Sequence, residues 1–422
     1  MDATTVIAEI AKKARTAART LANSSAKERN QVLLNIADQL EINLDLILKA
    51  NQIDMQAAQS AGINSSLQDR LLLTPNRVKA MAQAARDISK LPDPLGRIIV
   101  ESNLANGLNL KQISVPFGVV GMVYEARPNV TVDAAVILIK SGNAALLRGS
   151  STAVNSNQVL IDVMKKSFNG TPISSEVLQL IPATDRSTVT ALLTARGKID
   201  LVIPRGSAEL IRSVVDEATV PTIETGAGVC HVYVDKSADF KKAIAILINS
   251  KCDRPSVCNA AETLLIHQDI ANEFSPIALK ALTTAGVIIN TDEQSKKIAD
   301  KTGVKVNLAT QESWSTEYGT LEINVAQVSD VMGAIDHIAR YGTKHTEAIV
   351  ASDQDAISKF TSLNDCAAIM VNASTRFTDG GQMGFGAEIG ISNQKMHARG
   401  PMGLEQMTTT TWIVSGSGQI RE

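Results

Sequence analysis

The stretch FKKAIAILINSKCDRPSVCNAAETLLI, residues 240–266, joins a helical pattern to a strand pattern through a polar connector. Phe240 to Ile248 is apolar with helical spacing, and Thr263 to Ile266 is a short apolar run typical of a buried strand. The connector between them holds two thiols, two cations and a proline. Because connectors carry side chains that a rigid scaffold aims into clefts, this unit indicates both α/β character and the place of the chemistry.

Cys258 is the thiol of this connector that best fits a covalent nucleophile. The thiolate is the reactive form of cysteine, and nearby cations or the positive end of a helix stabilise it. Asn259, Ala260 and Ala261 follow, and these small or cap-forming residues suit the start of a helix whose dipole would favour a thiolate. The alternative is a buried structural thiol, since free cysteine packs as a small hydrophobic residue.

Strand and helix patterns alternate on both sides of this unit. Before it, strands are predicted at 119–124, 144–147, 178–181, 199–203 and 221–223, with helices at 131–140, 152–167, 186–195 and 207–218. A second set has strands at 229–234, 263–266, 287–289, 323–328, 348–351 and 367–371, with helices starting at 240, 270 and 331. This order predicts doubly wound parallel sheets, which bind ligands at the carboxyl ends of their strands. A change of domain is predicted near Gly226-Ala227-Gly228.

The two ends of the chain differ from this alternation. Residues 2–92 have helical spacing throughout, and a hairpin follows with strands Arg97 to Asn103 and Leu108 to Val115. Asn106-Gly107 between these strands is a strong turn signal. Thr408 to Val414 reads as a Thr-rich strand near the end. The hairpin fits either an arm used for association or an ordinary edge ribbon.

Composition excludes several classes of protein. The 422 residues carry a net charge of −2 and only 3% aromatic residues, so nucleic acid and anionic membranes are not expected as partners. Four cysteines without a CxxC pair argue against a disulfide framework or a zinc site, and no metal is expected. The N-terminal stretch lacks the pattern of a secretion signal and no apolar run is long enough to span a bilayer, so the expected location is cytoplasmic.

Two strand-to-helix turns are candidate anion sites, although the usual GxGxxG fingerprint and the P-loop are absent. Ile203-Pro204-Arg205-Gly206-Ser207 offers a flexible glycine, a cap-forming serine and backbone N–H groups. Leu147-Arg148-Gly149-Ser150-Ser151-Thr152 offers a cation and three hydroxyls suited to a ribose or a 2′-phosphate. Plain helix capping is the alternative for both turns. The five histidines are scattered, and each fits a surface or core position.

Several longer motifs resemble one family. They are Tyr124 to Thr131, Ser250 to Ala260, Val328 to Ile349, Asn372 to Gly381 and His397 to Leu404. Together they resemble the aldehyde dehydrogenase superfamily and, within it, the γ-glutamyl phosphate reductases, over nearly the whole chain. The resemblance implies an aldehyde dehydrogenase-like α/β fold with two doubly wound parallel-sheet domains and a β-hairpin oligomerisation arm. The implied boundaries are 1–96 and 116–227 for the cofactor domain, 228–404 for the catalytic domain, and 97–115 and 405–422 for the arm.

The resemblance also implies the reaction. L-glutamate 5-phosphate is reduced to L-glutamate 5-semialdehyde and phosphate by NADPH, through a thioester on Cys258, in proline biosynthesis. The implied partners are this small-molecule substrate, further copies of the chain in a homo-oligomer, and the kinase that makes the labile substrate. The implied cofactor-binding residues are Arg148, Ser150, Ser151, Arg205, Gly206, Ser207, Gly226 and Glu317. The implied substrate-binding residues are Arg127, Ser256, Arg376, Thr378 and Arg399, although each arginine also fits a plain surface charge.

The chain differs from the superfamily pattern in the oxyanion-hole residue and in its need for a general base. Asn129 is the candidate for the oxyanion-hole amide, with Arg127 as its rival, because a gap displaces this position. Glu224 falls on the general base of the superfamily, but reduction of an acyl phosphate needs no base to activate water. Two other functions remain open: an NAD-dependent oxidiser of another small aldehyde, which the last two motifs disfavour, and a non-catalytic scaffold that keeps the fold and the arm.

Overall fold

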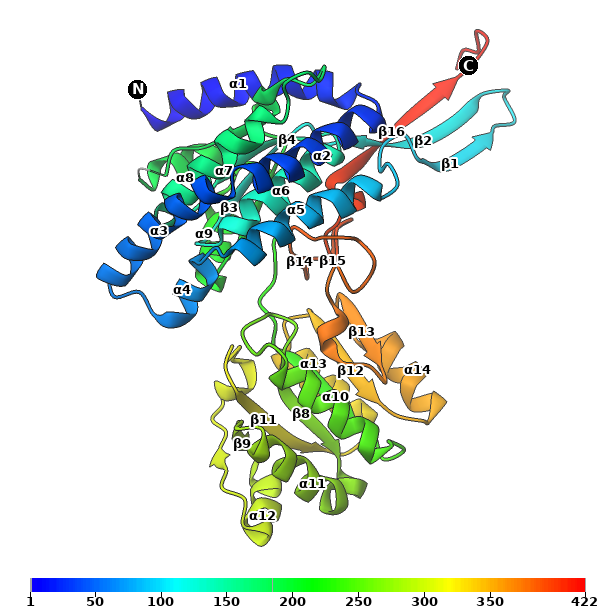
Figure 1. Ribbon diagram of the computed structural model, residues 1–422. Coiled ribbons are helices and arrows are strands. Elements are labelled where there is room, and N and C mark those ends of the chain that lie inside the picture. The colour runs from blue at the N-terminus through cyan, green and yellow to red at the C-terminus, as the bar shows by residue number, and fades with distance from the viewer. Residues whose placement is uncertain (1, 184, 422) are drawn as a thin grey trace. The chain divides into compact units, whose positions relative to one another are not determined.

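The computed structural model describes residues 2–183 and 185–421 (Figure 1). The chain forms two compact units, which are described one at a time. Unit 1 comprises residues 1–225, 384–390 and 402–422, and unit 2 comprises residues 226–383 and 391–401. A change of domain is predicted near Gly226–Gly228, and unit 2 begins at Gly226, while the cofactor, catalytic and arm ranges stay predictions. The predicted catalytic range 228–404 differs from unit 2, because residues 384–390 and 402–404 lie with unit 1.

Unit 1 begins with the predicted helical region, which is divided into α1 (Ala3–Ala22), α2 (Ala26–Ile42), α3 (Leu44–Ser60), α4 (Ser65–Leu71) and α5 (Pro75–Lys90). Side-chain caps explain where several of these helices begin. Ser25 and Glu28 form a reciprocal capping box at the start of α2, and Thr74 caps α5 just before Pro75. The four longer helices of this region bury apolar residues on one side, such as Ile7, Ala11, Ala14 and Leu21 in α1.

A four-stranded parallel sheet forms the centre of unit 1. Its order is β5 (Leu178–Leu180), β4 (Ala144–Arg148), β3 (Val119–Tyr124) and β6 (Leu201–Arg205). The helices α6 (Pro128–Lys140), α7 (Val154–Lys166), α8 (Ser187–Leu193) and α9 (Ala208–Glu217) alternate with these strands. The strand order reverses beside β3, since the chain adds β4 and β5 on one side and β6 on the other. Such a switch point is where doubly wound sheets bind ligands.

The helix α6 shows why this sheet is stable. It is apolar all round, and every residue from Ala134 to Lys140 is buried, as expected for a helix enclosed between layers. It packs against α2, α5 and α7. The predicted strand 221–223 is reduced to one parallel bridge between Val202 and Thr222. Pro221 cannot donate a ladder hydrogen bond, which is consistent with this short pairing.

The predicted hairpin is confirmed and gains a third strand. β1 (Ile98–Asn103) pairs antiparallel with β2 (Asn109–Pro116), and β2 pairs antiparallel with β16 (Thr408–Ser415). Gly107 adopts φ +85° in the turn, which explains the glycine there. The three strands extend away from the helices of unit 1 as a ribbon (Figure 1). Most of β1 and β16 is exposed, including Ile98, Ile99, Trp412 and Val414, each about half exposed.

Unit 2 is built on a seven-stranded parallel sheet. Its order is β10 (Asn307–Leu308), β9 (Ile288–Thr291), β11 (Glu322–Val328), β8 (Ala261–His267), β7 (Cys230–Val234), β12 (Thr346–Val350) and β13 (Ala368–Val371). The helices are α10 (Phe240–Cys252), α11 (Ala271–Thr284), α12 (Glu293–Thr302), α13 (Val331–Tyr341) and α14 (Gln354–Leu363). A two-stranded ribbon of β14 (Ile391–Ser392) and β15 (Gly400–Pro401) completes the unit.

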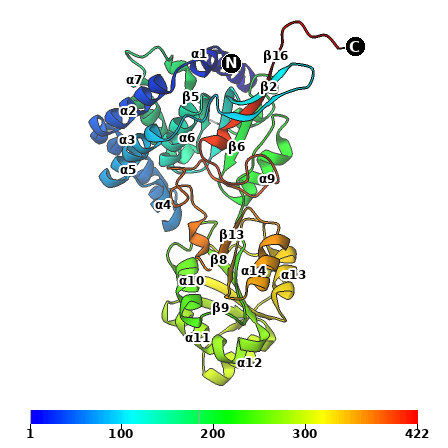
Figure 2. The same ribbon diagram turned by 90° about the vertical axis from the view of Figure 1, so that its right-hand side faces the viewer.

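Helices cover both faces of this sheet, as the prediction of a doubly wound sheet requires. Figure 2 shows α10 and α11 on one side of the strands and α13 and α14 on the other. Alternate residues of β7 show the same division, since Val232 packs with α10 and α11 while Tyr233 packs with α13 and α14. In the described part of the chain, every helix is too short or too polar to cross a bilayer.

Candidate functional site

Cys258 lies in unit 2, in the turn between the end of α10 and the start of β8. The residues after it form a turn closed by a hydrogen bond from the Ala260 N–H to the Val257 carbonyl, 3.0 Å, and then β8. The prediction of a helix starting at Asn259 is therefore wrong, because the apolar run that follows pairs as a central strand. Stabilisation of the Cys258 thiolate by a helix dipole does not apply at this position.

The turn of Cys258 lies at the amino end of the unit 2 strands. Gly228, which precedes β7, passes so close that a Cβ atom on it would lie 1.5 Å from the carbonyl oxygen of Cys258. The segment before β12 comes to the same edge, since the Val229 N–H donates to the Thr343 hydroxyl at 3.0 Å. Asn393 contacts the segment before β12, since its side chain donates to the Thr343 carbonyl at 2.7 Å. At the amino edge of this sheet, Gly228 therefore lies directly against the Cys258 turn, and hydrogen bonds join its segment to Thr343 and Thr343 to Asn393.

Burial raises the pKa of three of the four thiols. Cys230 is fully buried, its Sγ donates to the Cys258 carbonyl at 3.2 Å, and its pKa lies well above the ordinary range. Burial raises the pKa of Cys366 to about 12, and it raises the pKa of Cys252 as well. Cys258 is half-buried. The three other thiols are thus held in the protonated form that is a poor nucleophile.

A buried ion pair closes the base of the Cys258 connector. Lys251, at the end of α10, places its Nζ 2.6 Å from the Glu262 Oε2 at the start of β8, and both side chains are 0% exposed. The other Glu262 oxygen accepts from the Gly319 N–H at 3.4 Å, in the segment that carries Glu317. Burial raises the pKa of Glu262 to about 7, although the charge of Lys251 opposes this rise. The Glu262 carboxylate thus links the nucleophile connector to the segment of Glu317, which is predicted to bind the cofactor.

Buried histidines form a second polar group that the sequence did not distinguish. The Glu347 Oε2 accepts two hydrogen bonds from His231, one from the backbone N–H at 3.0 Å and one from the ring Nδ1 at 2.9 Å. The His337 ring lies edge-on to His231, and burial lowers the pKa of His337 to about 3. His345 contacts the Cys230 sulfur at 3.8 Å, and burial lowers its pKa to about 4. These rings lie in the core, and their pairing with carboxylate and thiol partners becomes visible only in the folded structure.

The predicted substrate residues of unit 2 have defined partners. Arg376 pairs with Asp253 at 3.1 Å and donates to the Asn259 side chain. Arg399 pairs with Asp365 at 2.8 Å, a carboxylate that Lys344 and Lys395 also approach. Thr378 is fully buried and accepts from the Thr346 hydroxyl at 3.0 Å. Ser256 is half-buried in the connector itself. Their contact with substrate stays a prediction.

Nine of the predicted site residues lie at the carboxyl edge of the unit 1 sheet. They follow β3, β4, β6 and the Thr222 bridge, on either side of the switch point: Arg127, Asn129, Arg148, Ser150, Ser151, Arg205, Gly206, Ser207 and Glu224. The remaining predicted cofactor residues, Gly226 and Glu317, lie in unit 2. Gly226 faces Asn393, whose side chain leaves no room for a Cβ atom. The clustering in unit 1 follows from parallel strands, whose carboxyl ends meet at one edge.

The N-terminus of α9 holds a carboxylate of the chain itself. Ser207 caps α9 by accepting from the Leu210 N–H, and its own N–H donates to the Glu125 Oε1 at 2.8 Å. A Cβ atom on Gly206 would lie 2.6 Å from the Glu125 carboxyl carbon. One backbone N–H of this turn therefore donates to a carboxylate of the chain itself, and binding of a cofactor phosphate at this turn stays a prediction. Arg205 is directed elsewhere, since its guanidinium donates to the Ile389 carbonyl.

The turn after β4 combines capping with an incompletely bonded cation. Ser150 caps the short helix that starts at Ser151, so the capping alternative holds for its hydroxyl. The Arg148 guanidinium donates to the Gly149 and Asp185 carbonyls at 3.2 and 3.0 Å. Its Nε is buried without a hydrogen-bond partner among the described residues. Ser151 is exposed at the start of the same turn.

The candidate oxyanion residues lie at the start of α6. Asn129 donates from its side chain to the Asp133 carboxylate at 3.0 Å, one helical turn away. Burial raises the pKa of Asp133 to about 6. Arg127 is the residue before α6 begins, and Glu224 is half-buried after the Thr222 bridge. Asn129 therefore has a polar partner to fix its orientation.

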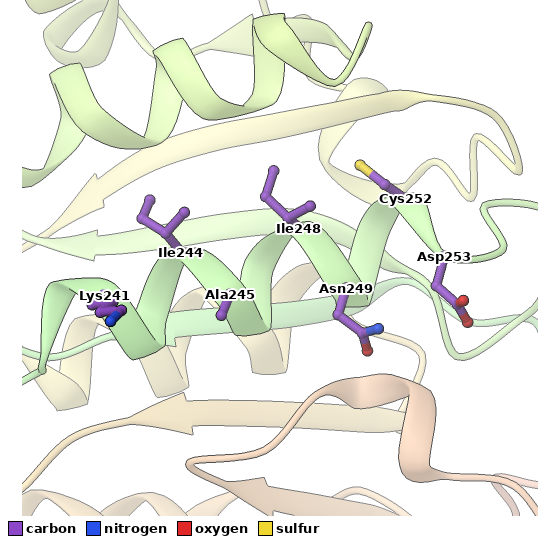
Figure 3. A pocket seen from close by; sticks show the side chains of 7 residues that line it. All are labelled: Lys241, Ile244, Ala245, Ile248, Asn249, Cys252 and Asp253. Atoms are coloured by element: carbon purple, nitrogen blue, oxygen red, sulfur yellow. The ribbon is translucent and has the colours of Figure 1, made fainter.

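A surface hollow along α10 is lined in part by Cys252, the other thiol of the predicted connector. Its lining residues are shown in Figure 3: Lys241, Ile244, Ala245, Ile248, Asn249, Cys252 and Asp253. All seven come from one helix and its last turn. In the described part of the chain, no group of three or more His, Cys, Asp or Glu side chains is arranged to hold a metal ion.

Comparison with known proteins agrees with this arrangement. The chain matches the aldehyde dehydrogenase family over residues 2–305. It is 50% identical over 415 residues to the gamma-glutamyl phosphate reductase of Thermobifida fusca, covering 98% of both chains, and 50% identical over 414 residues to that of Caldicellulosiruptor bescii, covering 98% and 99%. The crystal structure of gamma-glutamyl phosphate reductase from Thermotoga maritima is 44% identical and superposes with a TM-score of 0.95 over 98% of this chain and 99% of that one.

The family explains the general class of chemistry. Aldehyde dehydrogenases are oxidoreductases that use a nicotinamide cofactor, and the relatives described above are named gamma-glutamyl phosphate reductases. The fold expected from the sequence motifs is confirmed by the parallel sheets and by these structural neighbours. The chain therefore belongs to the γ-glutamyl phosphate reductases of the aldehyde dehydrogenase superfamily.

Proposed function

We propose that the chain reduces L-glutamate 5-phosphate to L-glutamate 5-semialdehyde and phosphate with NADPH, through a thioester on Cys258. The observation that carries this proposal is the 50% identity to relatives named gamma-glutamyl phosphate reductase over 98% of both chains. The connector of Cys258 supports it, because this half-buried thiol lies in a turn against which Gly228 packs so closely that no Cβ atom fits.

The features of unit 1 fit a dinucleotide phosphate. The Gly206–Ser207 turn already holds a carboxylate through a backbone N–H, and a Cβ atom on Gly206 would displace the Glu125 side chain that lies there. The Nε of Arg148 is buried without a hydrogen-bond partner among the described residues, so this nitrogen could donate to a bound phosphate or ribose oxygen. Arg148, Ser150 and Ser151 would hold the ribose and 2′-phosphate end, and Gly206 with Ser207 the pyrophosphate. NADPH, when bound, supplies the hydride that reduces the thioester.

The chain's own residues then account for the acyl transfer. The Cys258 thiolate attacks the γ-acyl carbon, the bond from that carbon to the phosphate oxygen breaks, and phosphate leaves with the electron pair. The developing oxyanion needs preorganised donors, for which the Cys258 N–H and the side chain of Asn129 or Arg127 are the candidates. Loss of one such donor typically costs about 10²- to 10³-fold in rate. After reduction the carbon–sulfur bond breaks, the aldehyde leaves and the Cys258 thiolate is restored.

This sequence of steps uses no activated water. Phosphate is already a good leaving group, and hydrolysis of the thioester would waste the substrate. Glu224 therefore has no duty as a general base in the forward reaction. The substrate carboxylate needs a cation, and arginine suits it because the planar guanidinium binds both oxygens. Arg127 and Arg399 remain the proposed partners for the anionic ends of the substrate.

The decisive experiment runs the reaction in reverse, with glutamate semialdehyde, phosphate and NADP, and records NADPH formation. Turnover should require phosphate, and Cys258→Ala should abolish it while the melting temperature stays within about 2 °C. Cys252→Ala is the matched control, because this half-buried thiol lines the hollow on α10. Phosphate-independent oxidation would instead favour an ordinary aldehyde oxidiser. Activity retained in Cys258→Ala would remove the thiol from the mechanism.

We also infer that the ribbon of β1, β2 and β16 associates with further copies of the chain. Ile98, Ile99, Trp412 and Val414 are each about half exposed on two edge strands, and such apolar edges are normally covered. Replacing Trp412 and Val414 by glutamate should lower the molar mass measured by light scattering. An unchanged mass would show that the ribbon does not hold the oligomer together.

A further inference from the structure

The guanidinium of Arg376 joins the two ends of the turn that carries Cys258. Arg376 lies in the short helix Thr375–Phe377, and its Nε donates to the Asp253 Oδ2 at 3.1 Å. Its Nη1 donates to the Asn259 Oδ1. Asp253 is the first residue after α10, and Asn259 is the neighbour of Cys258. One planar side chain therefore contacts the connector both before and after the sulfur.

The backbone around Arg376 is itself fixed against the same connector. The Ser374 hydroxyl lies 3.0 Å from the Ser250 hydroxyl in the last turn of α10, and the Thr375 N–H donates to that same hydroxyl at 3.2 Å. On the other side, the Asn259 side chain donates to the Thr378 carbonyl at 2.8 Å. Arg376 thus acts from a support that is hydrogen-bonded to α10 and to the far end of the connector.

The support continues into the core behind the sulfur. The Thr378 hydroxyl accepts from Thr346, whose hydroxyl lies 2.8 Å from the Nδ1 of the buried His345. His345 contacts Cys230, and Cys230 donates to the Cys258 carbonyl. These contacts therefore lead from Asn259, through Thr378, Thr346, His345 and Cys230, to the backbone carbonyl of Cys258. A closed chain of polar contacts of this kind holds its members in one arrangement.

These contacts leave Arg376 poorly suited to be a substrate ligand. Its side chain is 17% exposed, and its charge is already opposed by Asp253. Two of its nitrogen atoms are directed at the connector, and lysine could not reach both acceptors with one ammonium group. We propose that Arg376 is a positioning residue that sets the geometry of Cys258 through Asp253 and Asn259. The proposal rests on the function proposed above, in which Cys258 is the nucleophile.

The test compares Arg376→Met, Arg376→Lys, Asp253→Asn and the double variant Arg376→Met/Asp253→Asn in the reverse assay. Arg376→Met should lower kcat about 10- to 100-fold with KM for semialdehyde and phosphate within twofold, since a displacement of about 1 Å costs up to that much. Asp253→Asn should lower kcat in the same way but less. The double variant should be no slower than Arg376→Met, because both changes remove one interaction. Arg376→Lys should recover only part of the loss.

Hydrogen exchange of the backbone provides a readout that does not depend on turnover. Exchange in residues 253–260 should accelerate in Arg376→Met and Asp253→Asn, while the rest of unit 2 is unchanged. Lys296→Met is the matched control, since it breaks an exposed ion pair with Asp300 on α12. If the wild type shows no turnover in the reverse assay, the proposed function fails. The exchange data then still report on the contact of Arg376 with the connector.

Two results would overturn the inference. A raised KM with normal kcat and unchanged exchange in residues 253–260 would make Arg376 a substrate ligand. A lowered melting temperature with normal kcat and faster exchange throughout unit 2 would make it a structural residue only.

Discussion

The sulfur of Cys230 lies 3.2 Å from the carbonyl oxygen of Cys258 and donates a hydrogen bond to it. Two thiols with different environments are thereby placed at one turn. Burial raises the pKa of Cys230 well above its usual range, and the charge of Glu347 adds to this rise. Cys230 therefore stays protonated across the neutral range and acts as a support for the neighbouring residue.

Cys258 and Cys230 should differ in their rate of alkylation. Iodoacetamide at pH 7 to 8 should modify Cys258 and leave Cys230 intact, because only the thiolate reacts. Cys230→Ala should keep kcat within about tenfold of the wild type, since an S–H group is a weak donor. Peptide mass mapping after a timed reaction identifies the modified residue. Labelling of Cys230 at a rate equal to that of Cys258 would contradict this assignment of roles.

Gly228→Ala should disable the turn of Cys258 without a change in any reacting group. The added Cβ atom would lie 1.5 Å from the Cys258 carbonyl oxygen, and backbone atoms must move to make room. We expect kcat to fall by about 10²-fold or more, because the sulfur moves with its backbone. Gly333→Ala in α13 is the control, since the nearest atom there is the movable hydroxyl of Ser329 at 2.7 Å. Equal activity in both variants would mean that the turn tolerates displacement.

Glu125→Gln should strengthen binding of NADPH. The Glu125 carboxylate accepts from the N–H of Ser207, the N-cap residue of α9, at 2.8 Å, where a cofactor phosphate is proposed to bind. Removing the negative charge removes a competitor for this positive end of the helix, worth about 0.3 to 1 kcal/mol. Fluorescence titration should therefore show a dissociation constant lower by about two- to fivefold. Weaker binding would instead identify Glu125 as a ligand of the cofactor.

Lys251→Met should destabilise the protein in a pH-dependent way. The substitution leaves the Glu262 carboxylate buried without its cation, which typically costs about 3 to 5 kcal/mol. Burial already raises the pKa of Glu262 to about 7, above its value in the unfolded chain, and loss of Lys251 should raise it further. A raised carboxyl pKa means that the folded state binds the proton more tightly, so stability is lost as pH rises.

The denaturation midpoint of Lys251→Met should therefore fall more steeply between pH 5.5 and 8 than that of the wild type. Lys251→Met/Glu262→Gln should recover most of the loss, since the uncompensated charge is gone. A pH-independent loss, or no recovery in the double variant, would show that packing of the lysine stem is what matters.

The sequence predicted the sheet architecture well because strand and helix periods are local properties. The order of alternating segments before Gly226 is observed in β3 to β6, and the Asn106-Gly107 turn is present. The helices α12 and α14 were not predicted, since each is short and largely polar. The buried apolar residues are Ile298 and Ala299 in α12, and Ala356 and Phe360 in α14. The predicted helix after Cys258 failed because three small residues are compatible with a turn as well as a helix start.

The site was predictable as a set of segments but less so as a set of contacts. The turns after β4 and β6 could be recognised because strand, glycine and cap-forming serine are consecutive in the sequence. The pairs Lys251–Glu262, Arg376–Asp253 and Arg399–Asp365 could not be recognised, because their members are brought together only by the folded sheet. The return of residues 384–390 to unit 1 was missed for the same reason, since nothing local distinguishes this Gly-rich segment.

The composition of unit 1 from separate parts of the chain has a consequence for synthesis on the ribosome. β2 ends at Pro116, whereas its partner β16 begins at Thr408 and emerges only after unit 2. Throughout translation of unit 2, one edge of β2 lacks its neighbour, and the buried Asn143 lacks the Met407 carbonyl to which it donates at 2.8 Å. The nascent protein thus carries an open strand edge until β16 has emerged, which makes products stalled within unit 2 candidates for chaperone capture.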